Sequence, residues 1–131
     1  MQNTIFKGIV AKGLGQGIFF MSMPHYKKEI KKKLGFDAYP GTLNLKTNKS
    51  AIGLINSLLP IKIKGFKSSG KIYGAAKCYR AKINDVNGAI IIPDLTKHKN
   101  VIEFIAPIHL KSKLKIKEGD KVNIKLLEWQ K

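Results

Sequence analysis

Apolar and polar residues alternate along much of this chain, which is typical of strands that bury one face. Residues 121–129 show the pattern most clearly, because every second residue between Val122 and Leu126 is apolar. The run at 89–92 is instead apolar throughout and ends at Pro93, so this strand is expected to be buried on both faces. Strands are predicted at residues 4–12, 18–21, 42–45, 61–64, 71–83, 89–92, 101–106 and 121–129, with Gly74 as a candidate bulge.

Two segments have helical features. Tyr26, Ile30 and Leu34 recur at every fourth position of residues 24–34, which predicts an amphipathic helix, and Gly35 follows as its stop. A second short helix is predicted within residues 47–60. Its expected N-cap is Ser50, and Gly53 weakens the helical propensity of its interior.

These elements are mostly strands joined by glycine turns, with one or two short helices. The fold class predicted from them is mainly β, a small closed or nearly closed β-barrel. At 131 residues the chain is long enough to bury a core and short enough to be one domain, so we expect a single domain over residues 1–131.

The charge balance narrows the possible partners. The net charge of +17 comes from 25 basic and 8 acidic residues, and Arg80 is the only arginine. Such a field attracts polyanions of any kind, but arginine is the usual residue for reading bases and phosphates. Cys78 is the only cysteine, so no intrachain disulfide can form, and no run of about 18 apolar residues indicates a membrane span. We therefore expect a soluble, cytoplasmic protein that binds no membrane.

Two oxygen-bearing side chains follow the Pro40-Gly41 turn. Leu43 and Leu45 alternate with Thr42 and Asn44, so the hydroxyl and the amide are expected on one face of a strand. A hard cation such as Mg²⁺ accepts such oxygen ligands and can bridge a phosphate chain. The alternative is an ordinary strand whose polar residues face solvent.

Further candidates are a glycine loop and a lone acid. Gly13-Leu14-Gly15-Gln16-Gly17 matches neither a dinucleotide fingerprint nor a P-loop, but its backbone could approach an anion closely; the alternative is a hairpin turn. Glu103 interrupts an apolar strand, either as a carboxylate facing a cavity or on an outward face. Thr96 lies in a polar loop. The histidines His25, His98 and His109 do not have the spacing of a zinc site.

Several of these motifs together resemble the archaeal CTP-dependent riboflavin kinases. The resemblance covers nearly the whole chain in matching order: Gly13 to Gly17, Phe20, Tyr26, Leu34-Gly35-Phe36, Tyr39, Gly41-Thr42-Leu43-Asn44-Leu45, Gly88-Ala89-Ile90-Ile91-Ile92-Pro93 and Ile105-Ala106-Pro107. It implies a six-stranded cradle-loop β-barrel that makes FMN from riboflavin with CTP as donor. Members of that family can carry an N-terminal winged-helix domain, and we expect this sequence to correspond to the kinase part alone.

The resemblance also implies roles for individual residues. It assigns Mg²⁺ to Thr42 and Asn44, and a flavin contact to Thr96 and Glu103. From the place of Glu103 in an apolar strand we hypothesise that it orients or deprotonates the attacking hydroxyl; the alternative is that it binds the ribityl hydroxyls only. The implied nucleotide site comprises Gly13, Leu14, Gly15, Gln16, Gly17, Ile18, Ile108, His109, Leu110 and Lys111. The implied partners are CTP and CDP, riboflavin and FMN, with the protein acting as a monomer.

Two other classes of function remain open from the sequence. A nucleic-acid-binding β-barrel would explain the charge and would use exposed aromatics such as Phe19, Tyr73 and Tyr79. A non-enzymatic nucleotide or flavin carrier would use the same pocket without chemistry. The first gives no reason for Thr42 and Asn44 to share a face, whereas phosphoryl transfer does.

Overall fold

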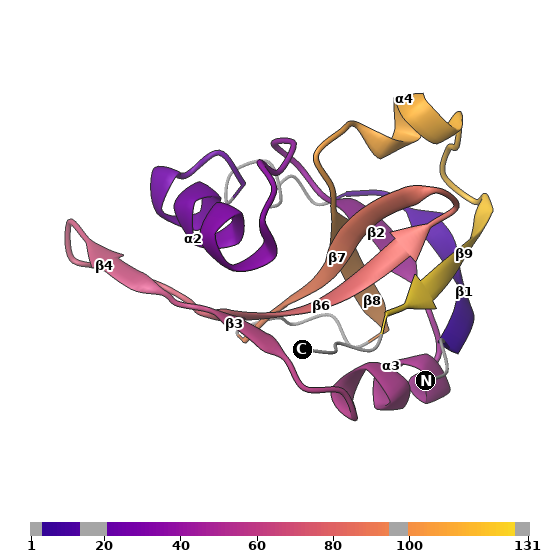
Figure 1. Ribbon diagram of the computed structural model, residues 1–131, viewed down its shortest axis with the longest axis horizontal. Helices are drawn as coiled ribbons and strands as arrows, with labels where there is room; N and C mark the ends of the chain where they lie inside the picture. Colours follow the sequence, from indigo (N-terminus) through magenta and orange to yellow (C-terminus); the bar gives the residue numbers. More distant parts are fainter. Residues whose placement is uncertain (1–3, 14–20, 95–99, 128–131) are drawn as a thin grey trace.

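The computed structural model describes residues 4–13, 21–94 and 100–127 (Figure 1). The strands are β1 (Thr4–Ala11), β2 (Leu43–Lys46), β3 (Ile61–Ile63), β4 (Phe66–Ser68), β5 (Lys71–Tyr73), β6 (Ala76–Ile83), β7 (Val86–Pro93), β8 (Val101–Ile105) and β9 (Lys121–Leu126). The helices are α2 (Pro24–Leu34), α3 (Lys49–Asn56) and α4 (Leu110–Leu114). No helix of this described part is both long and apolar enough to cross a membrane.

Six strands close into an antiparallel barrel, which confirms the predicted fold class. They follow the order β6, β7, β8, β2, β1 and β9, and β9 pairs back with β6. Closure is possible because β6 is long: its second half pairs with β9, as in Ala81 opposite Leu126, while its first half pairs with β3. The β4–β5 hairpin forms a separate two-stranded sheet that extends away from the barrel (Figure 1).

Strict alternation decides which side chains fill the barrel. Leu43 and Leu45 of β2 are 4% and 0% exposed and pack inside with Phe104 of β8 and Ile124 of β9. Their neighbour Asn44 must then lie on the outer face, because successive side chains of a strand point to opposite sides. The barrel interior therefore orients the polar residues of β2 toward the outside.

A second apolar cluster lies on the outer face of β6, β7 and β8, under α2. The helix buries the three apolar residues that predicted it against Cys78, Ile91 and Ile105. The 89–92 run is apolar throughout because Ile90 packs inside the barrel whereas Ile91 packs under α2. Gly35 ends α2 with φ of 88°, a left-handed conformation that favours glycine, as the sequence predicted.

The predicted N-cap of α3 is wrong. Asn48 caps this helix instead of Ser50, since the Asn48 side-chain oxygen accepts a 2.9 Å hydrogen bond from the Ala51 backbone N–H. Ser50 lies inside the first turn. The cap therefore falls two residues earlier, where the backbone is still extended.

The segment 71–83 is two strands in different sheets and not one strand with a bulge. β5 pairs with β4, a strand that the sequence did not predict, whereas β6 pairs with β7. The break falls at Gly74 and Ala75, where Gly65 crosses so closely that a Cβ on it would collide with the Tyr73 carbonyl and the Gly74 backbone. This close approach of two backbones explains why residue 65 is glycine.

The remaining differences are small. Helix α4 was not predicted, because its few residues look only lysine-rich in sequence. The strands end somewhat earlier than expected, at Ala11, Ile105 and Leu126. The predicted strand 18–21 lies outside the described residues except for Met21, which is buried and not in a strand.

The capping assignment predicts unequal effects of two neighbouring substitutions. Asn48→Ala should lower the free energy of unfolding by about 1 kcal/mol, because it removes the acceptor for the Ala51 amide. Ser50→Ala should change it by less than about 0.5 kcal/mol, the range usual for surface positions. Urea denaturation of both variants measures the difference. An equal loss in the two variants would contradict the assignment.

Candidate functional site

A pocket of about 360 Å³ opens where the start of β2 meets the segment after β8. One wall comes from the turn before β2, where Gly41 has φ of 139°, a conformation that favours glycine. The opposite wall is the start of α4. The described lining residues are Ala11, Gly13, Tyr39, Pro40, Gly41, Thr42, Leu43, Asn44, Phe104, Ala106, Ile108, His109, Leu110 and Lys111.

Thr42, Asn44 and Glu103 meet at one edge of this pocket. Asn44 of β2 lies directly opposite Glu103 of β8 in the antiparallel register. The Thr42 hydroxyl, just before β2, donates a 2.7 Å hydrogen bond to Glu103 Oε1. Thr42 and Asn44 both line the pocket, as expected if they act together. Three oxygen-bearing side chains thus come from two neighbouring strands.

The donor set fits a hard divalent cation. A hydroxyl and a side-chain amide supply neutral oxygen ligands of the kind that Mg²⁺ accepts. Because the Thr42 proton is directed to Glu103, the lone pairs of Thr42 Oγ1 remain available to a ligand on the pocket side. Gly13 leaves room for the amide, since a Cβ there would lie 3.2 Å from Asn44 Nδ2. Thr42 and Asn44 as cation ligands remain a prediction.

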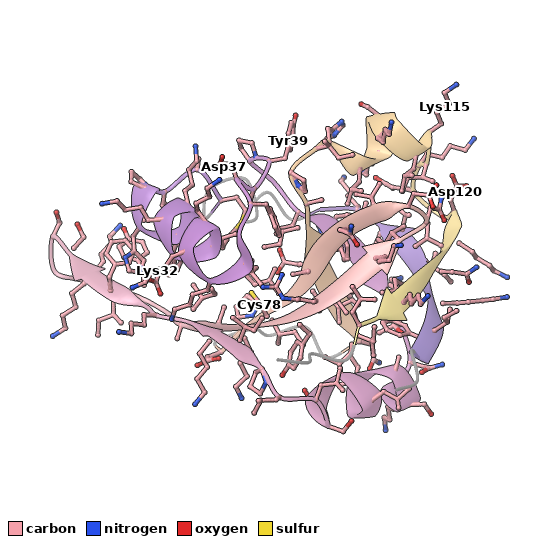
Figure 2. All side chains as sticks on the ribbon, in the orientation of Figure 1. Lys32, Asp37, Tyr39, Cys78, Lys115 and Asp120 are labelled. Atoms are coloured by element: carbon pink, nitrogen blue, oxygen red, sulfur yellow. The ribbon has the colours of Figure 1, made fainter. Side chains whose placement is uncertain are left out.

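Glu103 lies at a boundary between polar and apolar surface. It is half-buried on the outer face of β8, with Asn44 on one side and Ile91 on the other. On the next strand, Ile91 of β7 lies opposite Cys78 of β6, whose side chain is on the face of β6 that α2 covers (Figure 2). Glu103 is not among the described residues that line the pocket. Its carboxylate is linked to the pocket edge by the hydrogen bond that it accepts from the Thr42 hydroxyl.

Cys78 is part of the core and not a nucleophile. The side chain is fully buried, and burial raises the pKa of its thiol to about 12. The reactive thiolate is therefore not populated near neutral pH. The sequence interpretation of Cys78 as a small buried hydrophobe is confirmed.

The segment after β8 supplies the other wall of the pocket. Residues 108–111, which belong to the nucleotide site implied by the family resemblance, all line it. His109 stands at the N-cap position of α4, and its Nδ1 lies 2.6 Å from the Ser112 hydroxyl oxygen, which fixes the ring. Leu110 is 5% exposed and also packs in the barrel core, so it anchors the segment as well.

Tyr39 is a pocket residue to which the sequence assigned no role. Its backbone N–H donates a 2.8 Å hydrogen bond to the Ala106 carbonyl, and its ring lies 5.0 Å from that of His109 at 37°. The side chain is 41% exposed and points outward between α2 and α4 (Figure 2). A signal was available in the sequence, since Tyr39 belongs to the motifs that carry the family resemblance.

Some predicted residues lie elsewhere or outside the description. Leu14, Gly15, Gln16, Gly17, Ile18 and Thr96 lie outside the described residues, as do Phe19 and His98. His25 is remote from the pocket: its ring lies 4.5 Å from Phe66 at the base of the β4–β5 hairpin.

The aromatic surface expected of a nucleic-acid-binding barrel is not formed by the two tyrosines proposed for it. Tyr79 is 4% exposed inside the barrel, where burial raises the pKa of its phenol. Tyr73 is half-buried and stacks on Phe66, with ring centroids 4.8 Å apart. The prediction that these two rings are exposed for base stacking is wrong, which leaves charge as the main support for that class.

Comparison with known proteins identifies the family of this chain. Residues 10–126 match the family CTP-dep_RFKase, described as "Domain of unknown function DUF120". Proteins named riboflavin kinase from Pyrobaculum islandicum and Methanoregula boonei are 44% and 41% identical over 123 residues, each alignment covering 91% of this chain. The chain spans 58% and 55% of the length of these two relatives. It spans 68% of the riboflavin kinase of Ignicoccus hospitalis, at 38% identity over 122 residues and 90% of this chain. The chain therefore belongs to the CTP-dependent riboflavin kinase family.

Proposed function

We propose that this chain transfers the γ-phosphate of CTP to the 5′-hydroxyl of riboflavin, giving FMN and CDP. The observation that carries the proposal is the joining of Thr42 to Glu103 by a 2.7 Å hydrogen bond, beside Asn44, at the edge of the pocket. Phosphoryl transfer needs little more from a protein than positioned groups and compensation of charge. The names of the relatives support riboflavin as acceptor, and the family name supports CTP as donor.

Thr42 and Asn44 are the residues that would hold Mg²⁺ in this reaction. When bound, Mg²⁺ supplies positive charge that offsets the negative charge of the phosphate chain. The protein's own part is to keep both oxygen donors on one face, which the buried Leu43 and Leu45 ensure. Glu103 keeps the Thr42 hydroxyl in one orientation by accepting its proton in a hydrogen bond.

The reaction requires that a proton leaves the flavin. The riboflavin 5′-oxygen forms a bond to the γ-phosphorus, the bond from the γ-phosphorus to the β,γ-bridging oxygen breaks, and CDP leaves with that oxygen. The hydroxyl proton passes to a base, and we assign this role to Glu103. Glu103 lies between the polar residue Asn44 and the apolar residue Ile91. This position supports the assignment, because the carboxylate would have the phosphates on one side and the apolar flavin ring on the other.

The nucleotide would occupy the α4 side of the pocket. Ile108, His109, Leu110 and Lys111 would contact the base, and Gly13 begins the loop that would wrap the phosphates. We retain Leu14, Gly15, Gln16, Gly17 and Ile18 as nucleotide residues and Thr96 as a flavin residue from the family resemblance. The net charge of +17 supports attraction of the polyanionic donor. A monomer in the cytoplasm is the simplest setting for such an enzyme.

Product formation tests the proposed activity. The purified chain, incubated with riboflavin, Mg²⁺ and CTP, should form FMN and CDP, measured by separating the flavins chromatographically. ATP in place of CTP should give FMN much more slowly. Absence of FMN with every nucleoside triphosphate would refute the kinase activity, and flavin binding without product would indicate a carrier.

The cation site predicts a magnesium-dependent defect. Thr42→Val and Asn44→Ala should each raise the Mg²⁺ concentration needed for half-maximal FMN formation by at least about tenfold, because each removes one oxygen ligand. Thr47→Val is the matched control, since Thr47 follows the same strand and its hydroxyl donates a 3.4 Å hydrogen bond to the Lys7 carbonyl. Unchanged magnesium dependence in the first two variants would exclude them as ligands.

A pH profile separates the possible roles of Glu103. Glu103→Gln keeps the shape of the side chain but cannot accept a proton, so kcat should fall by about 10²-fold or more and the acidic limb of the kcat profile should disappear. Steady-state kinetics over a range of pH measures both effects. A small loss with an unchanged profile would rule out general-base catalysis and leave Glu103 as a ligand of the ribityl hydroxyls.

A further inference from the structure

Arg80, the single arginine among 25 basic residues, joins the barrel to the end of α2. It lies in the middle of β6 and is half-buried on the outer face of the barrel. Its Nη1 donates a 3.1 Å hydrogen bond to the Leu34 carbonyl, and its Nη2 donates a 3.3 Å bond to the Lys33 carbonyl. Both carbonyls belong to the last turn of α2, whose C=O groups lack partners within the helix.

The geometry explains why this one position is arginine. A planar guanidinium presents parallel N–H groups that can satisfy two adjacent carbonyls at once, whereas a lysine ammonium is a single point charge on a flexible stem. A positive charge at the C-terminal end of a helix is also favourable for the helix dipole. The contact therefore fixes both the position and the orientation of the last turn.

The segment after this contact leads directly into the pocket. Ala38 is buried in the cluster under α2, and the Tyr39 N–H is bonded to the Ala106 carbonyl at 2.8 Å. Thr42 then reaches Glu103. Residues 33–42 are thus held by the two α2 carbonyls at the start, by Ala38 and Tyr39 in the middle and by Thr42 at the end.

We propose that Arg80 is a positioning residue for the pocket. By fixing the end of α2 it limits where residues 35–42 can lie, and so holds Tyr39 and Thr42 in place. The strand register supports the coupling, because Arg80 pairs with Ala89, and Ala89 pairs with Ile105, the neighbour of Ala106. The effect of Arg80 on catalysis rests on the proposed function. Its effect on the position of residues 35–42 does not.

The competing explanation is that Arg80 contributes only to overall stability. The helix has other attachments, including the Tyr26 hydroxyl, which donates a 2.6 Å hydrogen bond to the Gly74 carbonyl, and the buried Ile30. If these are sufficient, loss of the guanidinium would weaken the whole fold evenly. The two explanations therefore differ in which part of the chain opens more often when Arg80 is replaced: residues 35–42 alone, or the whole fold.

Amide hydrogen exchange of the apo protein, followed by NMR, distinguishes them. Arg80→Lys and Arg80→Met should speed exchange of the Tyr39 amide by about tenfold or more, as expected from loss of hydrogen bonds to a charged group. Amides of β2, which is paired on both sides, serve as the internal reference. Lys82→Met is the control variant, because Lys82 lies two residues along the same strand on the same face and is also half-buried. It should leave Tyr39 unchanged.

The proposal is overturned if the amide exchange rates of Tyr39 and β2 increase equally, or if the exchange rate of Tyr39 does not increase. Arg80→Lys keeps the charge and carries the test alone if Arg80→Met does not fold.

In kinetic assays Arg80→Lys should raise KM for riboflavin or CTP by about tenfold with a smaller change in kcat, since it misplaces binding groups and removes no reacting group. Unchanged KM would also count against the proposal. If the unmodified chain makes no FMN, the proposed function fails while the exchange measurement still tests the role of Arg80.

Discussion

The antiparallel pairing of β2 with β8 is the constraint on which the site depends. In this register Asn44 lies opposite Glu103, and Leu43 and Leu45 fill the barrel from the other side. A slip by one residue would turn the two leucines outward and Asn44 into the core, so burial of apolar surface strongly disfavours it. The arrangement of oxygen atoms at the pocket is therefore maintained by the apolar side chains that pack inside the barrel.

The excess of lysine has a physical cost that the fold tolerates. Lysines lie directly opposite one another in the sheet at Lys62 and Lys77, and again at Lys82 and Lys125. Like charges in such pairs repel, although salt and solvent reduce the effect on an exposed surface. Only two ion pairs are found among the described residues, Lys31 with Asp37 and Lys33 with Glu29. The field is therefore largely uncompensated and available to attract polyanions.

Periodicity predicted much of this structure because it reports burial. It located α2 and its glycine stop, the alternation of β9, and the apolar run of β7 that serves two cores. It failed where a contact between distant segments decides the outcome. The crossing of Gly65 with the Gly74 backbone separates β5 from β6, and no local pattern contains that information. Helix α4 is likewise too short for its periodicity to be seen.

The candidate site was predicted in part for the same reason. Thr42 and Asn44 share a short stretch of chain, so their common face could be predicted from spacing, although their role in a site came from the family resemblance. The hydrogen bond from Thr42 to Glu103 spans 61 positions, and no local pattern predicts it. The central claim is that this edge holds a divalent cation. Paramagnetic broadening by Mn²⁺ in the presence of CDP tests it most directly. The account predicts early loss of the amide signals of Thr42, Leu43 and Asn44, with those of α3 retained. Broadening centred elsewhere, or none at these residues, would contradict it.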